Sequence, residues 1–308
     1  MSFSDLHDIF SGRIGSNYCV KSLLYLKSSR GAKEYLAAIH KITFEKGDIS
    51  RRQKWSKYPH LRKGPPVDII SERDLLSSAF LNIRSDKLSF DISRFTEFLA
   101  GYNKVDEDIK PVMLHYALIY LFDFFSATWL KYEQNRGHGI VMIPSTKKRP
   151  LTQISVTVKQ NGIFPRAVDA FYFLGQSSLF SLDNHGGIGY YFNPAGGGTI
   201  SKRIRKMQYS ASPTVSLSRL VDLYERFGKI VGHVSKSNYI LVGYVILFTL
   251  SSICRYRAQE WFRISKDRNL KSKFELLQYD FVHEWIPEIL MQTILTKNLQ
   301  KELSISAE

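Results

Sequence analysis

The residues best suited to chemistry in this chain are cations placed among aromatic rings. The segment Arg51–Lys63 reads RRQKWSKYPHLRK. Cations neutralise phosphates and release counterions, and aromatic rings stack with unpaired bases. The segment therefore predicts a nucleic-acid contact, and the alternative is a solvated loop pinned to the body by its rings. The residues predicted to make this contact are Arg51, Arg52, Lys54, Trp55, Lys57, Arg62 and Lys63.

A second basic segment follows a histidine beside a glycine. His138-Gly139 precedes the triplet Lys147, Lys148 and Arg149. Glycine lets a backbone approach a ligand closely, and the cations could hold a phosphate. An imidazole titrates near neutral pH, so His138 is a candidate general acid or base. The alternative is a turn followed by a basic hairpin.

A third basic segment closes a glycine-rich run that begins at Gly186. Backbone N–H groups of such a run can bind phosphate. The run lacks the G-x-x-x-x-G-K-[ST] pattern of a P-loop, so a surface loop or a flexible nucleic-acid arm is the alternative. The cations that would contact the nucleic acid are Lys202, Arg203, Arg205 and Lys206.

Arg226 and His233 are the catalytic candidates. An R-x4–6-H motif on a helix is typical of the HEPN class of metal-independent ribonucleases, and this pair matches it. A chain with this many arginines and histidines is also expected to contain such a pair by chance. Gly228 and Gly232 further weaken a helix there. Whether the chain is an enzyme stays open.

Arg255 and Tyr256, with Trp261 nearby, close a long apolar segment. Arginine at the end of a buried helix often pairs with a carboxylate, here Glu260 or Asp280. We expect this group to be structural, and the alternative is an arginine that faces a ligand.

Metal and cofactor chemistry is not expected. The eight histidines form no H-x3-H or H-E-x-x-H pattern, and Cys19 and Cys254 form no CxxC pair. Both cysteines lie among apolar residues, which predicts reduced thiols and a cytoplasmic location. The apolar segments Met113–Leu130 and Tyr239–Leu250 are interrupted or too short to span a bilayer, so no membrane partner is expected.

Composition agrees with a folded protein that binds a polyanion. The 308 residues include 43 Lys and Arg against 28 Asp and Glu, a net charge of +15, and 44% are hydrophobic. This composition excludes a disordered tail and allows a substantial core. The charge favours nucleic acid or an acidic protein surface as partner.

The pattern along the chain predicts helices at both ends and strands in the middle. Helical spacing covers Ser22–Phe44 with a break at Gly31, and Ser71-x-x-Asp74 is an N-cap signal. Pro111 should open a long apolar helix through Leu130. Further helices are expected over 90–99, 239–261 and 274–299, with Pro287 as a kink.

Alternating residues predict one strand over Thr152–Val158. Asn161-Gly162 is a turn signal, so Ile163-Phe164 should begin a partner strand. The predicted fold class is mainly α with a small β insert (α+β), in which central apolar helices enclose a short hairpin or sheet around residues 151–195. We expect a single domain over 1–308, with helices in 1–135 and 211–308 and the insert in 136–210.

The chain resembles the YaaC-like family of bacterial and archaeal proteins over roughly residues 70–300. The resemblance is carried, in order, by Ile109–Leu118, by His138-Gly139 with Lys147–Arg149, by Val156–Phe164, and by Leu250–Tyr256 with Trp261. It implies a mainly helical prokaryotic protein with no established catalytic residues, sometimes encoded near antiviral defence genes.

These observations together predict a nucleic-acid-binding YaaC-like protein that serves as a subunit of a prokaryotic antiviral defence assembly. Two alternatives stay open. One is a HEPN-like ribonuclease that uses Arg226 and His233, and the other is a scaffold that docks an acidic protein partner.

Overall fold

The computed structural model describes residues 16–45, 70–131, 137–143, 154–158, 162–164, 166–167, 170, 214–216, 221 and 236–293. Most of these residues are helical, which confirms the mainly helical class. The helices are α2 (Ser16–Leu26), α3 (Ser29–Glu45), α5 (Glu72–Leu76), α6 (Ser78–Tyr102), α7 (Lys110–Trp129), α12 (Lys236–Tyr256), α13 (Ala258–Lys266), α14 (Arg268–Asp280), the π-helix η3 (Phe281–Trp285) and α15 (Ile286–Thr293).

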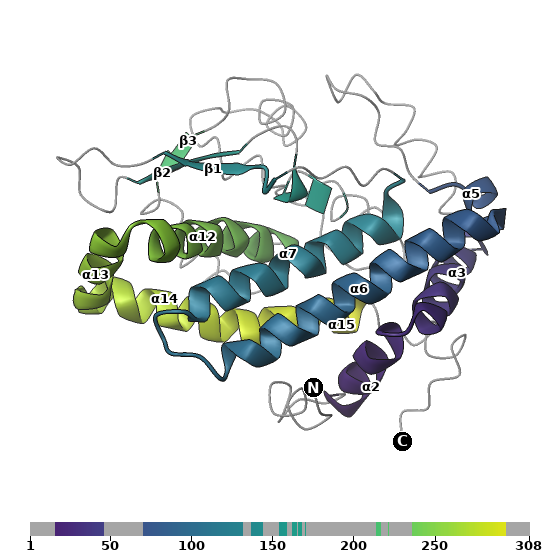
Figure 1. Cartoon of the computed structure of the whole chain (residues 1–308), viewed down its shortest axis with the longest axis horizontal. Helices are drawn as coiled ribbons and strands as arrows, with labels where there is room; N and C mark the ends of the chain where they lie inside the picture. Colours follow the sequence, from purple (N-terminus) through teal and green to yellow (C-terminus); the bar gives the residue numbers. More distant parts are fainter. Residues whose placement is uncertain are drawn as a thin grey trace.

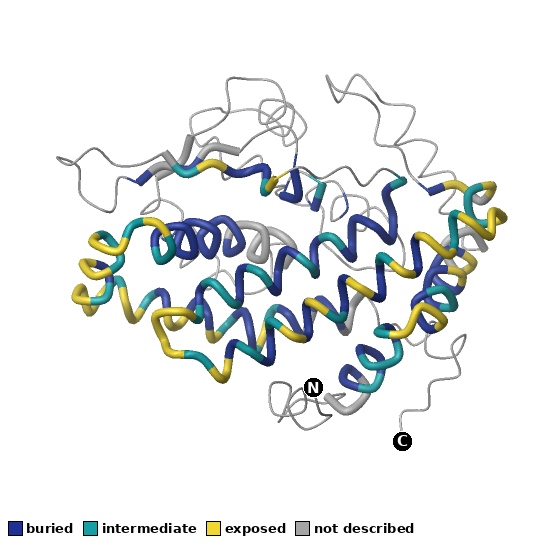
Figure 2. Tube along the Cα trace, in the orientation of Figure 1, coloured by how far each residue is buried: buried dark blue, intermediate teal, exposed yellow. Residues whose placement is uncertain are grey.

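Helix α7 is the centre of the molecule. Its sequence is apolar on all sides, and Pro111 occupies its first turn, where a missing N–H loses no helical bond. It packs between α6 and α12, and α3 packs against α6 (Figure 1). Figure 2 shows α7 buried along most of its length. An apolar helix needs cover on every side, and these neighbours provide it.

Among the described helices, α7 alone has the length and hydropathy of a membrane span. However, 72% of its most apolar window is buried inside the protein. Such burial is typical of a core helix. By length and hydropathy, α7 is nonetheless a more continuous apolar helix than expected from the sequence of Met113–Leu130.

The first helical stretch breaks earlier than predicted. Helix α2 ends at Leu26 and α3 begins at Ser29, so Gly31 lies in the first turn of α3 rather than at the break. A Cβ at position 31 would collide with the carbonyl of Tyr25. The glycine therefore permits the sharp approach of the two helices. At the far end of α3, the Nε2 atom of buried His40 lies 2.9 Å from the carbonyl oxygen of Thr128 in α7.

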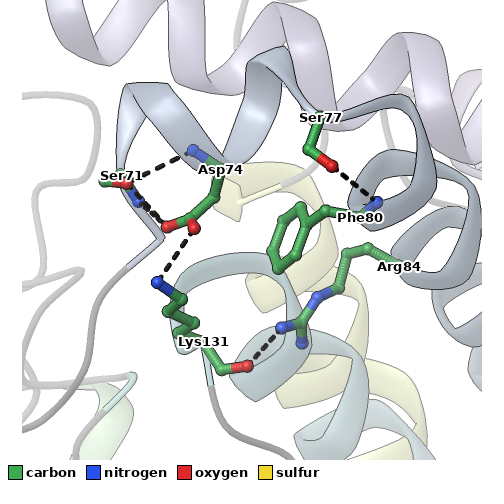
Figure 3. A network of polar contacts seen from close by, with 6 residues as sticks. All are labelled: Ser71, Asp74, Ser77, Phe80, Arg84 and Lys131. Atoms are coloured by element: carbon green, nitrogen blue, oxygen red, sulfur yellow. Dashed lines mark hydrogen bonds and ion pairs between the residues drawn. The ribbon is translucent and has the colours of Figure 1, made fainter.

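A polar network fixes the start of α6, as Figure 3 shows. The predicted N-cap is confirmed as a full capping box, in which Ser71 and Asp74 bond to each other's backbone N–H at the start of α5. Asp74 also pairs with Lys131 at 2.9 Å. The Ser77 side chain accepts from Phe80 N–H, and Arg84 donates to the carbonyl of Lys131 at 2.6 Å. The helix that follows is a single 25-residue element, longer than the predicted 90–99.

The strands form an antiparallel sheet in the order β1 (Ile140–Ile143), β2 (Ser155–Val158) and β3 (Thr214–Ser216). Ile143 pairs with Ser155, and Ser155 pairs with Ser216. Strand β2 lies within the predicted Thr152–Val158, and buried Ile154 and Val156 carry the predicted alternation. The sheet lies along the α12 side of the helices (Figure 1). The full extent of the insert around 151–195 falls mostly outside the described residues.

The predicted partner strand at Ile163-Phe164 is wrong. These residues are helical, and their N–H groups bond to the carbonyls of Gly137 and His138 at 3.1 Å. Gly162 has φ +131°, and a Cβ there would collide with the backbone of Gly139. Gly162 therefore brings the chain against the loop before β1, and β2 takes its partners from more distant segments.

The helices of the C-terminal third also have other boundaries than the sequence predicts. The helix expected over 239–261 is divided at Arg257 into α12 and α13. The predicted stretch from Phe274 passes through η3, where Ile286 N–H bonds to the carbonyl of Phe281, five residues back. Pro287 follows at once in α15. Because proline has no N–H, it cannot bond to the carbonyl four residues back.

Candidate functional site: the histidine cluster between α7 and α12

Among the predicted nucleic-acid and catalytic residues, the described part of the chain contains only His138. The other predicted residues lie outside the described residues. They are Arg51, Arg52, Lys54, Trp55, Lys57, Arg62, Lys63, Lys147, Lys148, Arg149, Lys202, Arg203, Arg205, Lys206, Arg226 and His233. The site that can be built from geometry is therefore the surroundings of His138.

His138 sits on a short loop between two glycines with positive φ, Gly137 at 86° and Gly139 at 71°. The 162–164 turn holds the loop in place through its two backbone hydrogen bonds. Phe164 also connects this turn to α12, because its ring stacks on that of Tyr244 with centroids 5.8 Å apart. The loop is thus fixed to α12 by backbone and ring contacts together.

The side chain of a second histidine, His115, packs against that of His138. His115 is on α7, is fully buried, and has its ring centroid 5.4 Å from that of His138. Tyr244 lies 5.2 Å away, and Phe248 lies within 5.5 Å of both histidines. We call His115, His138 and Tyr244 the histidine cluster.

Both histidines are held in the neutral form. Burial, with smaller contributions from His138 and Arg255, lowers the pKa of His115 well below its ordinary value of 6.5. Burial and the Arg255 charge also lower the pKa of His138. Burial, reinforced by Asp123, raises the pKa of Tyr244, so its hydroxyl stays protonated. The cluster is thus uncharged at neutral pH.

Several polar atoms of the cluster have no hydrogen-bond partner among the described residues. They are both ring nitrogens of His115, Nδ1 of His138 and the hydroxyl of Tyr244. Buried polar atoms of this kind are uncommon, and each carries a desolvation penalty. Neutral imidazoles can accept a proton or ligate a metal, but the described residues contain no group of three His, Cys, Asp or Glu placed to hold one.

Arg255 closes the cluster at the end of α12. Its Nη1 donates to the Tyr116 hydroxyl at 2.7 Å and its Nε donates to the carbonyl of Ser251 at 3.2 Å. The expected pairing of Arg255 with Glu260 or Asp280 is wrong, because Arg255 forms no ion pair with a described carboxylate and Glu260 pairs with Arg257 at 3.0 Å. These contacts knit α12 to α7, in agreement with the structural role predicted for Arg255.

Sequence reasoning did not single out His115 or Tyr244 as site residues. The available signal was a histidine within the apolar helix at 112–130. Its neighbours could not be found from spacing, because they come from a distant helix and a distant loop.

No family model, curated protein or solved structure matches this chain. The resemblance to the YaaC-like family therefore stays a prediction.

Proposed function

We propose that this protein binds nucleic acid through its basic segments at Arg51–Lys63, Lys147–Arg149 and Lys202–Lys206. The supporting observation is the distribution of charge. Acidic and basic residues nearly balance in the described residues, so most of the net charge of +15 belongs to the rest of the chain. Charge needed only for solubility has no reason to concentrate in this way.

The described anchors of these segments favour a shared surface. His40 in α3 contacts the end of α7, and the N–H of Ile70 bonds to the carbonyl of Trp129 at 3.1 Å, so the chain leaves and rejoins the fold there. The segment Lys147–Arg149 lies between β1 and β2 in the sequence, and the segment Lys202–Lys206 precedes β3. Helix α5 and the sheet lie along the same long side of the molecule (Figure 1).

The finer parts of the proposal rest on the sequence alone. They are the β insert around residues 151–195, the membership of the YaaC-like family, a cytoplasmic location and a role as a subunit in antiviral defence.

The test is binding of a fluorescent single-stranded oligonucleotide to the full chain at low salt. Arg51→Gln, Arg52→Gln and Lys54→Gln combined should weaken binding about tenfold or more, because three phosphate contacts are lost. The matched control combines Arg30→Gln, Arg73→Gln and Arg94→Gln, which removes the same charge from exposed helical positions. Equal loss in both variants would show a general charge effect, and no binding by the wild type would contradict the proposal.

A further inference from the structure

One end of the described framework is strongly basic. It is the corner where α12 ends, α13 follows and α14 begins, and we call residues 255–273 the basic corner. Its basic residues clearly outnumber its two acidic residues, Glu260 and Asp267. The basic residues are Arg255, Arg257, Arg263, Lys266, Arg268, Lys271 and Lys273.

Local structure gives this corner its exposed face. Arg257 interrupts the helix with φ −142° and ψ 60°, and Asp267 caps α14 by accepting from Asn269 and Leu270 N–H. Between these two breaks, α13 buries little beyond Ile264. Figure 2 shows exposed positions along α13 and the first turns of α14 at one end of the molecule.

Two large aromatic rings lie exposed in the basic corner. Tyr256 is 74% exposed and Phe262 is 61% exposed. Each ring has a cation against it, since the Arg255 guanidinium lies 4.9 Å from the Tyr256 centroid and Lys266 Nζ lies 5.2 Å from the Phe262 centroid. Exposed rings beside cations are what single-stranded nucleic-acid surfaces use to stack bases.

Three cations of the basic corner are available to a ligand. Within the described residues, Arg263, Lys266 and Arg268 form no ion pair, although acidic residues lie on the same helices. Their positions in α13 and at the start of α14 place positive charge along the exposed face. Unpaired surface cations bind phosphates without first breaking a salt bridge.

We propose that the basic corner is a contact surface for single-stranded nucleic acid. Phe262 and Tyr256 stack bases, and Arg263, Lys266 and Arg268 contact phosphates. The proposal rests on the proposed function and adds a site within the helical framework. A lipid surface fits less well, because Glu260, Asp267 and Glu275 interrupt the face and the exposed side chains form no continuous aliphatic stripe.

The test measures the affinity of the full chain for an oligouridine of about 20 nucleotides and for a duplex of the same length. Phe262→Ala and Tyr256→Ala should each weaken oligouridine binding about tenfold, with an unchanged salt dependence, because a stacking contact is lost rather than a phosphate contact. Duplex binding should change little, because paired bases are not free to stack. The matched control is Leu276→Ala on α14, where Leu276 is 59% exposed and the change should leave both affinities unaltered.

A second variant addresses the phosphates. Arg263→Gln, Lys266→Gln and Arg268→Gln combined should weaken binding and flatten its salt dependence. Suppose that Phe262→Ala and Tyr256→Ala keep wild-type affinity, while the combined Arg51, Arg52 and Lys54 variant loses it. This result would contradict the proposal for the basic corner and leave the proposed function standing. No binding by the wild type would overturn both. If Phe262→Ala lost binding to phosphatidylserine vesicles but not to oligouridine, the corner would be a lipid surface and this inference would be wrong.

Discussion

Two polar regions of this protein are built in opposite ways. At the start of α5, Ser71, Asp74 and Lys131 are joined by hydrogen bonds and an ion pair (Figure 3). In the histidine cluster, the nitrogens of His115 and the hydroxyl of Tyr244 have no partner among the described residues. The first region is partnered and the second is held by packing. The network around Asp74 should therefore stabilise the fold through its charges, whereas the histidine cluster should do so only while it remains uncharged.

The histidine cluster should make stability depend on pH in the mildly acidic range. Because the pKa values of His115 and His138 are lowered, the folded protein binds fewer protons than the unfolded chain. Stability is therefore full above pH 6.5 and is lost as the pH falls below it. Between pH 7 and pH 5, His115 alone should contribute a loss of up to about 2 kcal/mol in the free energy of unfolding.

Urea unfolding of the wild type and of His115→Phe at both pH values measures this loss. The variant should keep the aromatic packing and lose less stability between pH 7 and pH 5. An identical pH dependence in the two proteins would show that the cluster does not govern acid sensitivity.

The partnered region should respond at lower pH and to removal of charge. Burial opposes ionisation of Asp74, but hydrogen bonds from Ser71 and the Lys131 ammonium outweigh it and lower its pKa to about 2. The stabilisation by ionised Asp74 is fully present at pH values above 3.8, the ordinary pKa of an aspartate, and is lost as the pH falls towards 2. Asp74→Asn should destabilise the protein at pH 7 by about 1–2 kcal/mol, after allowance for solvent screening.

Urea unfolding at pH 7 also tests this region. The control is Asp86→Asn, which removes the same charge from an exposed position on α6 and should change stability by less than about 0.5 kcal/mol. Equal effects of the two changes would mean that the capping box and ion pair add nothing.

Two tyrosines provide the smallest and most direct comparison. Tyr116 accepts a hydrogen bond from Arg255, so Tyr116→Phe should destabilise by about 1 kcal/mol. The Tyr244 hydroxyl has no partner in the described part of the chain, so Tyr244→Phe should be neutral or slightly stabilising. Thermal melts of both variants at pH 7 distinguish them. A clear loss in Tyr244→Phe alone would show that its hydroxyl is bonded in solution.

Local signals predicted the local elements of this fold. Pro111 with an apolar run marked α7, the Ser71-x-x-Asp74 pattern marked an N-cap, and alternation marked β2. Each of these features depends on residues within a few positions of one another, so the sequence displays it directly.

Long-range features escaped prediction for a physical reason. The partners of β2 lie far away in sequence, and Ile163-Phe164 is drawn into a turn by carbonyls of another loop. His115 meets Tyr244 only because α12 packs on α7. The basic corner likewise depends on exposure, since Phe262 could equally have been a core residue of an amphipathic helix.

The affinity of the full wild-type chain for a single-stranded oligonucleotide, measured as salt is raised, tests nucleic-acid binding by this protein. A protein that binds through several cations should lose affinity steeply, with a linear fall of log K against log salt of about 0.7 per phosphate contacted. We expect a fall corresponding to several contacts. Absence of binding at low salt, or an affinity that does not change with salt, would contradict the account.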